Sequence, residues 1–143
     1  MTLEKKLSQY FGYDEFKEGQ EKIIEAVLNG KDVLGIMPTG GGKSLCYQLP
    51  AIQMEGLTLV ISPLISLMKD QVDSLSEMGI ASTFLNSSLD DATYEQRLEK
   101  IRSNQYKLLY IAPERLNSYS FLEMAKQLNI SMIAVDEAHC ISQ

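Results

Sequence analysis

Apolar and polar residues alternate along this chain in two periods, one typical of helices and the other of buried strands. Near the start, Leu3, Leu7, Tyr10 and Phe11 recur at helical spacing, whereas residues 57–61 form a short run of apolar and β-branched side chains. The pattern predicts helices over residues 2–11, 20–28, 45–53, 64–78, 88–102 and 120–128. It predicts strands over residues 32–37, 57–61, 80–85, 107–111 and 131–135.

The order of these elements favours an α/β fold. Strands and helices alternate with short connections, which is typical of βαβ units whose largely parallel sheet is covered by helices on both faces. Two helix starts carry a capping-box signal, since Ser88 stands three residues before Asp91 and Ser120 three residues before Glu123. No repeat or linker divides the chain, so we expect one domain.

The composition fits one globular core. Of the 143 residues, 45% are hydrophobic and 22% are charged, a balance typical of a folded domain rather than a disordered segment. The formal net charge of −6 and the isoelectric point near 4.8 disfavour a free-standing basic nucleic-acid binder, because neutralising phosphates requires a cationic face. A charge total does not describe a local patch, so DNA binding stays open.

Cysteine and histidine usage bears on compartment and metals. Cys46 and Cys140 lie far apart and the chain has a single histidine, so we expect no zinc site of protein ligands here. Unpaired cysteines fit a reducing interior. The sequence has neither a signal-peptide pattern nor an apolar run of the roughly 20 residues that span a bilayer. We therefore expect a soluble, cytoplasmic protein with no membrane partner.

A glycine-rich segment follows the first predicted strand and has chemistry suited to a nucleoside triphosphate. Only glycines let backbone N–H groups approach phosphate oxygens closely, and the next helix directs the positive end of its dipole at the same anion. Lys43 can reach the β- and γ-phosphates, and the Ser44 hydroxyl can ligate Mg²⁺. The residues of this phosphate loop are Pro38, Thr39, Gly40, Gly41, Gly42, Lys43 and Ser44.

One position departs from the general phosphate-loop pattern. The pattern G-x-x-x-x-G-K-[ST] has glycine where this chain has Met37. A glycine-rich turn that merely precedes Lys43 and Ser44 is the simpler alternative. Three successive glycines between an apolar strand and a helix favour a phosphate site over that alternative.

The last predicted strand runs directly into Asp136, Glu137, Ala138 and His139. The carboxyl ends of parallel strands are where open α/β sheets bind ligands. Asp136 is placed to hold the Mg²⁺ bound by Ser44, and Glu137 to orient or deprotonate the attacking water. The alternative is that the two acids only cap a following helix, worth ~0.3–1 kcal/mol. A phosphate loop in the same chain favours the catalytic interpretation.

These four residues resemble the DEAH box of superfamily 2 helicases, and the match extends over five blocks, the last of which contains the box. Residues 37–44 are similar to the first motif of these helicases, in which the leading glycine is often absent, and residues 11–20 (FGYDEFKEGQ) to the adenine-reading motif of the RecQ family. Residues 62–71 (SPLISLMKDQ) resemble motif Ia, and residues 110–116 (YIAPERL) resemble motif Ib. Residues 136–143 (DEAHCISQ) are similar to the entry of an aromatic-rich loop. In this order, the blocks resemble the RecQ family of ATP-dependent DNA helicases.

The resemblance implies a RecA-like P-loop NTPase fold. Residues 1–143 would form the N-terminal part of the first motor lobe, truncated at the C-terminus, with the second lobe and the zinc-binding and winged-helix regions absent. ATP and Mg²⁺ are the implied cofactors, with zinc only in the absent region. Catalytic roles are implied for Lys43, Asp136, Glu137 and His139.

The upstream block has chemistry suited to adenine. The Gln20 amide can pair with the N7 acceptor and the N6 amino donor of adenine together, and Tyr13 can stack on the ring. The family usually has arginine where this chain has Lys17. Because lysine lacks the planar stacking and the bidentate fork of arginine, we expect adenine binding of altered strength. For Phe11 and Phe16 we expect core packing instead.

The DNA contacts rest on the resemblance. Motifs Ia and Ib supply side chains that can donate to a DNA backbone from strand ends and helix starts: Ser62, Ser66, Lys69, Gln71 and Arg115. A solvated helix face explains Lys69 and Gln71 equally well. No residue suggests base-edge readout, so we expect sequence-tolerant binding of single strands and duplex junctions.

Three functions are compatible with these residues. The first, which the resemblance to the RecQ family implies, is 3′–5′ DNA unwinding driven by ATP in recombination and repair, close to the nucleoid if the cell is bacterial. The 143 residues would be inactive alone, because the second lobe supplies an arginine finger worth ~10³–10⁵ in rate. The second is a P-loop ATPase or kinase acting on a small substrate, and the third is a non-enzymatic nucleotide-binding module. The glutamine block and the DEAH box favour the first.

Overall fold

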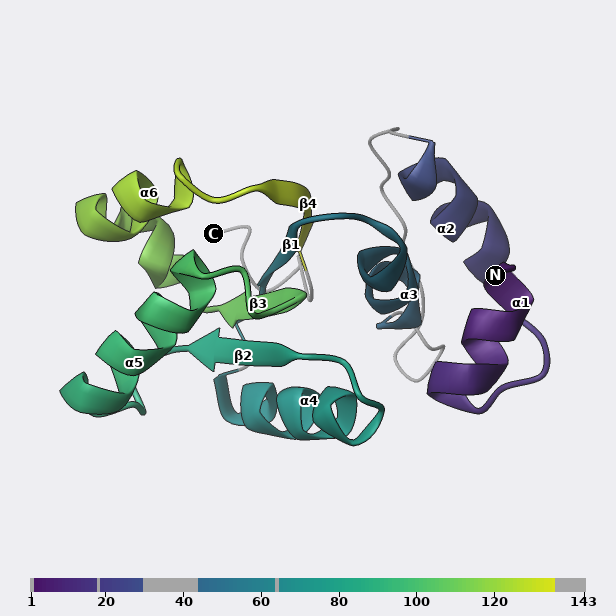
Figure 1. Cartoon of the computed structure of the whole chain (residues 1–143), viewed down its shortest axis with the longest axis horizontal. Coiled ribbons are helices and arrows are strands. Elements are labelled where there is room, and N and C mark those ends of the chain that lie inside the picture. Colours follow the sequence, from purple (N-terminus) through teal and green to yellow (C-terminus); the bar gives the residue numbers. More distant parts are fainter. Residues whose placement is uncertain (1, 18, 30–43, 64, 136–143) are drawn as a thin grey trace. The chain divides into compact units, whose positions relative to one another are not determined.

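The computed structural model describes residues 2–17, 19–29, 44–63 and 65–135. The chain divides into two compact units, Met1–Met54 and Glu55–Gln143, whose elements are shown in Figure 1. The predicted strand over residues 32–37 lies outside the described residues, as do the phosphate loop up to Lys43 and the acidic box from Asp136 onward.

The first unit begins with a helix of two geometries. α1 (Leu3–Lys6) starts after Thr2, whose hydroxyl accepts a 3.2 Å hydrogen bond from the backbone N–H of Lys5. The helix continues as the π-helical turn η1 (Leu7–Phe11) and ends at Gly12, where φ is +76°. A left-handed residue is the usual helix terminator, and glycine adopts that conformation without steric cost. The helix predicted over residues 2–11 is therefore confirmed.

Two further helices pack against this one. α2 (Gln20–Leu28) and α3 (Leu45–Gln53) have the bounds that the apolar pattern predicts. Their apolar sides meet in a cluster of Leu7, Ile24, Leu45 and Leu49, with Leu3, Phe11, Phe16, Leu28 and Ile52 packed around it. Phe11 and Phe16 thus belong to the core of this unit, as expected.

The second unit is built on a parallel sheet. Within the described residues its strands are β1 (Leu57–Ile61), β2 (Ser82–Leu85), β3 (Leu108–Ile111) and β4 (Ile130–Val135), in the spatial order β2-β3-β1-β4. Every neighbouring pair runs parallel. The connections contain α4 (Ile65–Glu77), α5 (Asp91–Arg102), and η2 (Pro113–Asn117) followed by α6 (Tyr119–Ala125). The predicted α/β fold with a parallel sheet is confirmed.

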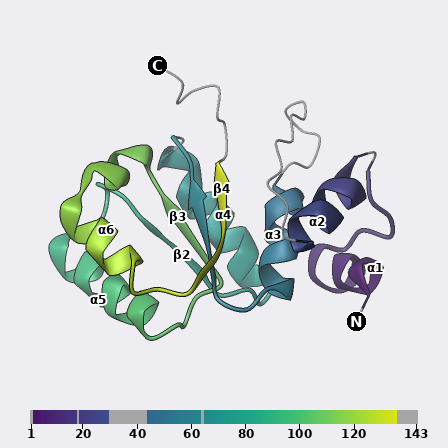
Figure 2. The same ribbon diagram turned by 90° about the horizontal axis from the view of Figure 1, so that it is seen from above.

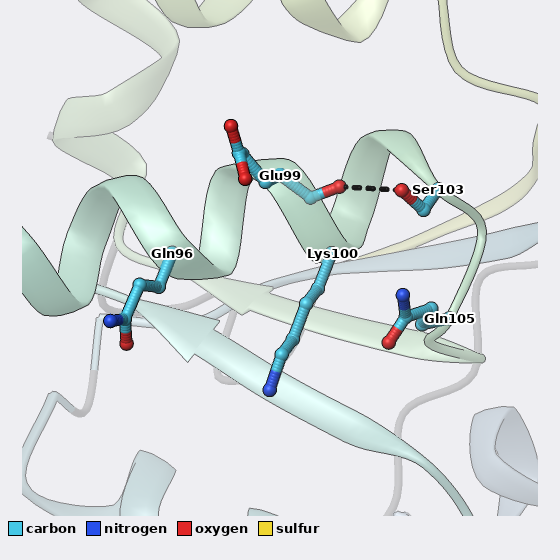
Figure 3. Close-up of a pocket in the computed structure, with 5 residues that line it drawn as sticks. All are labelled: Gln96, Glu99, Lys100, Ser103 and Gln105. Carbon is cyan, nitrogen blue, oxygen red and sulfur yellow. Dashed lines mark hydrogen bonds between the residues drawn. The ribbon is translucent and has the colours of Figure 1, made fainter.

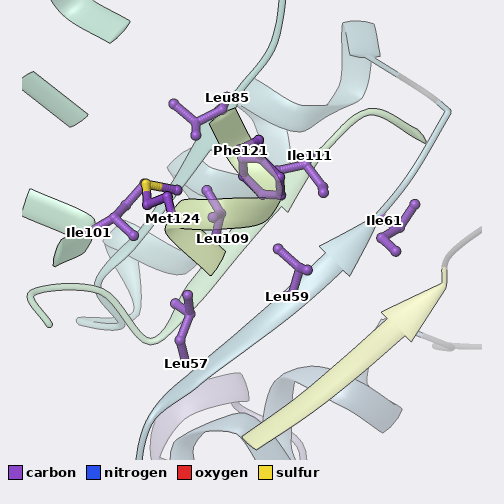
Figure 4. Close-up of a cluster of buried hydrophobic side chains, with 9 residues drawn as sticks. All are labelled: Leu57, Leu59, Ile61, Leu85, Ile101, Leu109, Ile111, Phe121 and Met124. Carbon is purple, nitrogen blue, oxygen red and sulfur yellow. The ribbon is translucent and has the colours of Figure 1, made fainter. Parts of the chain in front are cut away.

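Helices cover both faces of this sheet, α5 and α6 on one face and α4 on the other (Figure 2). Successive side chains of a strand point to opposite faces. Because helices cover both faces, all five residues of β1 are buried. The face under α5 and α6 holds a cluster of buried hydrophobic side chains, which Figure 4 shows. Its members are Leu57, Leu59, Ile61, Leu85, Ile101, Leu109, Ile111, Phe121 and Met124. Burial on both faces explains why these strands read as continuous apolar runs.

The start of α5 differs from the prediction. Asp90, not Ser88, is the capping residue: its carboxylate accepts a 2.7 Å hydrogen bond from the backbone N–H of Thr93. This hydrogen bond holds the pKa of Asp90 below its ordinary value. Ser88 cannot cap because its own N–H donates to the side-chain oxygen of buried Asn86, at 2.8 Å, and so does its hydroxyl. The Ser88 capping box was therefore wrong by two residues.

The segment after β3 also differs. Ser118 caps α6 by accepting a 3.3 Å hydrogen bond from the backbone N–H of Phe121, so the predicted cap Ser120 lies inside the helix. Before it, Pro113 opens the 3₁₀ turn η2, which the apolar pattern did not predict. A turn this short presents too few residues for its period to be recognised in sequence.

Candidate functional site

The expected nucleotide site begins, within the described residues, at the amino end of α3. Ser44 precedes this helix, and its carbonyl accepts hydrogen bonds from the backbone N–H groups of Tyr47 and Gln48, at 3.2 and 2.9 Å. The Ser44 hydroxyl makes no capping bond to its own helix. Pro38, Thr39, Gly40, Gly41, Gly42 and Lys43 lie outside the described residues. The helix that the phosphate loop requires is therefore present, starting directly after the loop.

α3 is well anchored for a helix that receives a ligand at its end. Seven of its nine residues are buried, from Leu45 to Ala51. Burial raises the pKa of the Cys46 thiol, which favours the neutral form of this cysteine. A fixed helix end keeps its N–H groups and dipole directed at one place, as anion binding requires.

The acidic box follows the carboxyl end of β4. β4 ends at Val135, which pairs with Ile61 at the carboxyl end of β1. Asp136 is the next residue, and it lies outside the described residues together with Glu137 and His139. The strand that must carry the box is confirmed. The convergence of Asp136 and Lys43 on one Mg²⁺ stays a prediction.

The three predicted adenine residues lie in the described part of the first unit. Gln20 is 3% exposed, whereas Tyr13 is 56% exposed and Lys17 is also exposed. The side-chain oxygen of Gln20 accepts a 2.7 Å hydrogen bond from the Lys17 N–H, and the Gln20 N–H donates to the Lys17 carbonyl at 3.1 Å. Gly19, at φ +86°, supplies the left-handed residue of this tight turn. The turn fixes the Gln20 amide in one orientation.

This orientation is compatible with the predicted adenine pairing. An amide oxygen has two acceptor lone pairs, so the Gln20 oxygen can accept from the N6 amino group of adenine while it holds the Lys17 N–H. An exposed Tyr13 ring is available for stacking. Lys17 contributes its backbone to the arrangement of Gln20, a role in which lysine and arginine are equivalent. Binding of adenine by these residues stays a prediction.

The residues expected to contact DNA lie in motifs Ia and Ib of the second unit. Ser62, 5% exposed, follows β1 and donates its backbone N–H to Ile111 at 2.9 Å, while Ser66 is exposed and Gln71 half-buried on α4. Lys69 forms an exposed ion pair with Asp73 at 2.8 Å, and this hydrogen bond raises the pKa of the lysine. An exposed pair of this kind is weak, so Lys69 can exchange its partner for a phosphate.

Arg115 of motif Ib has a different environment. It lies in η2, at the carboxyl end of β3, and its side chain is half-buried. The Cζ atom of its guanidinium is 4.8 Å from the centroid of the Tyr94 ring. Tyr94 belongs to α5, which follows the carboxyl end of the neighbouring strand β2. Sequence spacing did not indicate this pair, because its members belong to different βα connections.

A shallow depression in the second unit lies away from these residues. It is lined by Gln96, Glu99, Lys100, Ser103 and Gln105 (Figure 3). These residues surround the end of α5 and the turn that leads into the amino end of β3. The acidic box follows the carboxyl end of β4, at the opposite edge of the sheet, so the depression does not correspond to the expected nucleotide site.

The described ranges contain no group of three or more His, Cys, Asp or Glu side chains arranged to hold a metal ion. Because Asp136 and Glu137 lie outside these ranges, this finding does not bear on the expected Mg²⁺ site. None of the described helices combines the length and the hydrophobicity that crossing a membrane requires.

The sequence of the chain is similar to those of known helicases. The DEAD/DEAH box helicase family matches residues 17–143. The chain is 55% identical over 137 residues to the ATP-dependent DNA helicase RecQ of Haemophilus influenzae, covering 96% of the chain and 22% of that protein. It is 50% identical over 138 residues to the RecQ protein of Bacillus subtilis, covering 96% and 23%. The chain thus spans about a fifth of the length of these relatives.

Solved structures share the fold. A DUF1998 helicase, MrfA, bound to DNA and AMPPNP superposes with a TM-score of 0.75 at 25% identity, covering 98% of the chain and 21% of MrfA. A hypothetical ATP-dependent RNA helicase from Sulfolobus tokodaii gives a TM-score of 0.75 at 21% identity, covering 97% and 42%. At these identities the comparisons support the fold, and they match the RecA-like expectation.

Proposed function

The chain belongs to the DEAD/DEAH box helicase family, and from this premise we propose that its full-length gene product is an ATP-dependent DNA helicase of the RecQ type. The observation that carries the proposal is 50–55% identity over 96% of the chain to named RecQ helicases. The fold supports it, because α3 begins directly after the phosphate loop and β4 ends directly before the DEAH box.

The residues fit a Mg²⁺-bound nucleoside triphosphate. The fit rests on the Ser44 hydroxyl, which makes no capping hydrogen bond to its own helix. A serine hydroxyl beside a helix N-terminus has the chemistry of a magnesium ligand. Gly40, Gly41, Gly42 and Lys43 would hold the phosphates, and Asp136 would complete the metal site. The bound metal ion would neutralise charge that develops on the transferred phosphoryl group.

The remaining roles are assigned to this chain's own side chains. Glu137 would orient the attacking water and take its proton, and His139 would act beside it in the DEAH box. Gln20 would select adenine from its fixed orientation, with Tyr13 stacked on the base. The Gln20 amide would select adenine because its N–H can donate to N7 while its oxygen accepts from the N6 amino group.

The proposal extends to the DNA substrate and the direction of unwinding. We propose 3′–5′ unwinding of single-stranded and junction DNA in recombination and repair, in the cytoplasm. Ser62, Ser66, Lys69, Gln71 and Arg115 would donate to phosphates, which carry no sequence information, and binding would therefore be sequence-tolerant. The 143 residues would bind nucleotide weakly and would not unwind DNA without a second lobe.

The net charge of −6 favours the alternative of a P-loop ATPase that does not act on nucleic acid. One experiment separates the helicase function from this alternative. ATP turnover by the full-length gene product is measured with and without single-stranded DNA, beside a Lys43→Ala variant. The helicase proposal expects turnover that rises with DNA and is lost in the variant. Turnover that is lost in the variant but indifferent to DNA would support the ATPase alternative. A protein that binds ATP without turnover under either condition would instead be a nucleotide-binding module.

A second measurement addresses the isolated residues 1–143. We expect no DNA-stimulated turnover above that of the Lys43→Ala form of the same chain. Clear stimulation would show that these residues need no second lobe for catalysis.

A further inference from the structure

We propose that Tyr94 is a positioning residue for DNA binding, which holds the Arg115 guanidinium in the plane that meets a backbone phosphate. The proposal rests on the proposed function, and it adds a residue that lies in none of the helicase-like sequence blocks. The juxtaposition that carries it is the 4.8 Å distance between the Arg115 Cζ and the centroid of the Tyr94 ring.

Two adjacent strands bring these residues together. β2 and β3 pair in parallel, with Leu85 opposite Ile111 at their carboxyl ends. The chain leaving β2 enters α5, which carries Tyr94 in its first turns, and the chain leaving β3 enters η2, which carries Arg115. Both side chains therefore lie at the edge of the sheet where parallel α/β proteins bind ligands.

The backbone on each side of the pair is fixed. The Arg115 N–H donates to the Ala112 carbonyl at 3.0 Å, and the Ser118 N–H donates to the Arg115 carbonyl at 3.1 Å. On the other side, Asp90 caps α5 and its carbonyl accepts a 3.0 Å hydrogen bond from the Tyr94 N–H. The Tyr94 ring packs against the core cluster below α5 and α6. A ring held in this way restricts the arginine more than solvent would.

Stacking leaves the donors of Arg115 available. A guanidinium presents its N–H groups within its own plane, so a ring against one face does not block them. Among the described residues Arg115 has no carboxylate within ion-pair distance; the exposed ion pairs found there join Lys69 to Asp73 and Lys126 to Glu123. A planar, half-buried cation without a carboxylate partner is suited to a phosphate, which its fork can bind through two hydrogen bonds.

A second stacked arginine shows what a structural role looks like. Arg97 lies 4.5 Å over the Phe84 ring, but its Nη1 donates a 2.9 Å hydrogen bond to the Phe84 carbonyl oxygen. The Arg97 Nη1 donor is thus used in a hydrogen bond within the protein. Arg115 makes a similar cation–π contact without a comparable hydrogen bond to the described residues, and this difference favours an external anion as its partner.

The experiment measures binding of a labelled oligo-dT single strand by the full-length gene product over a range of salt concentrations. Replacing a phosphate-binding cation lowers the salt dependence by roughly 0.7 of a unit in log–log slope for single strands. We expect Arg115→Ala to show this loss with affinity reduced about three- to tenfold, and Tyr94→Leu to lower both quantities in the same direction. Tyr94→Phe, which keeps the ring, should bind like the wild type.

Two controls separate positioning from stability. Tyr106 packs against the same core cluster but precedes β3, at the opposite edge of the sheet, so Tyr106→Leu should destabilise the unit without changing the salt slope. The double variant Tyr94→Leu/Arg115→Ala should bind no more weakly than Arg115→Ala alone, because the ring acts through the arginine.

The outcomes distinguish the two proposals. A wild-type protein that does not bind the oligonucleotide overturns the proposed function and this inference with it. Normal binding that Arg115→Ala weakens and Tyr94→Leu leaves unchanged overturns the role of Tyr94 alone. Equal loss of slope in Tyr94→Leu and Tyr106→Leu also overturns it, because a general loss of stability would then explain both.

Discussion

The guanidinium of Arg97 lies over the ring of Phe84, with Cζ 4.5 Å from the centroid, while its Nη1 donates a 2.9 Å hydrogen bond to the Phe84 carbonyl. This contact protects an edge. β2 is the outermost of the described strands on its side of the sheet. The Ala81 carbonyl accepts from Lys107 at the start of the neighbouring strand. Carbonyls alternate in direction along a strand, so that of Phe84 points outward, where Arg97 occupies it.

Removing the Arg97 side chain should destabilise the second unit and leave the Phe84 carbonyl at the edge of β2 exposed. We expect Arg97→Leu to lower the free energy of unfolding by about 2–4 kcal/mol, the sum of a charge-assisted hydrogen bond and a cation–π contact. Urea denaturation of the chain measures this change. Light scattering should show increased self-association, because an uncovered edge pairs with other edges. Arg102→Leu, an exposed position on the same helix, is the matched control; equal losses in both variants would contradict the edge role.

Two glycines with similar backbones provide a second prediction. Gly56 and Gly79 have φ of +91° and +83°, but a Cβ on Gly56 would overlap the Asn129 carbonyl oxygen and the Ser131 hydroxyl, whereas one on Gly79 would meet nothing. Gly79→Ala should therefore cost only the left-handed conformation, about 1–2 kcal/mol. Gly56→Ala should cost at least twice as much, because the Asn129 carbonyl also accepts the 2.8 Å hydrogen bond from Leu57. Similar unfolding free energies for the two variants would show that the segment around Asn129 yields easily.

A carboxyl pair between α1 and α2 predicts a pH effect. Partial burial and a hydrogen bond with Glu4 raise the pKa of Glu21 above 4.5, with Glu25 contributing by repulsion. Ionising Glu21 thus costs the folded state more than the unfolded state. The stability associated with this group is fully present below its unfolded pKa and is lost as the pH rises through the higher folded value.

We therefore expect Glu21→Gln to have a higher Tm than the wild type at pH 7, and the difference to shrink as the pH falls below 4.5. Thermal unfolding followed by circular dichroism across this range measures it. Glu15→Gln, at an exposed position of the same unit, is the matched control for the loss of one negative charge. A Glu21→Gln variant that is less stable than the wild type at pH 7 would contradict the assignment.

The acidic box predicts a separation of binding from catalysis. In the full-length gene product, Glu137→Gln should lower kcat for ATP by about 10²–10⁴, the usual contribution of a general base, while KM changes little. Lys43→Ala should weaken nucleotide binding itself. Steady-state ATPase and nucleotide-binding measurements on both variants test this division. Loss of nucleotide binding in both would show that Glu137 contacts the nucleotide rather than the water.

Much of the fold could be predicted because many of its elements are locally specified. β1 has its predicted bounds because a run of only five consecutive apolar or β-branched residues favours a strand buried on both faces over a helix. α2 and α3 follow from helical spacing that ends at Asn29 and Met54. The cap of α5 could not be predicted, since Ser88 and Asp90 are both good capping residues. The burial of Asn86, which depends on α4 and β2 together, decided between them.

Three properties could be predicted from the sequence alone: most of the strands and helices, the parallel direction of the strands, and the residues that have the chemistry of a triphosphate site. Each element depends on neighbours within a few positions of the chain, and the parallel direction follows from the alternation of strands with helices. The tertiary structure decided the strand order β2-β3-β1-β4, the outward carbonyl that Arg97 covers, and the stacking of Arg115 on Tyr94. Each of these joins residues from separate elements, and such contacts form only after the sheet has brought distant strand ends to one edge.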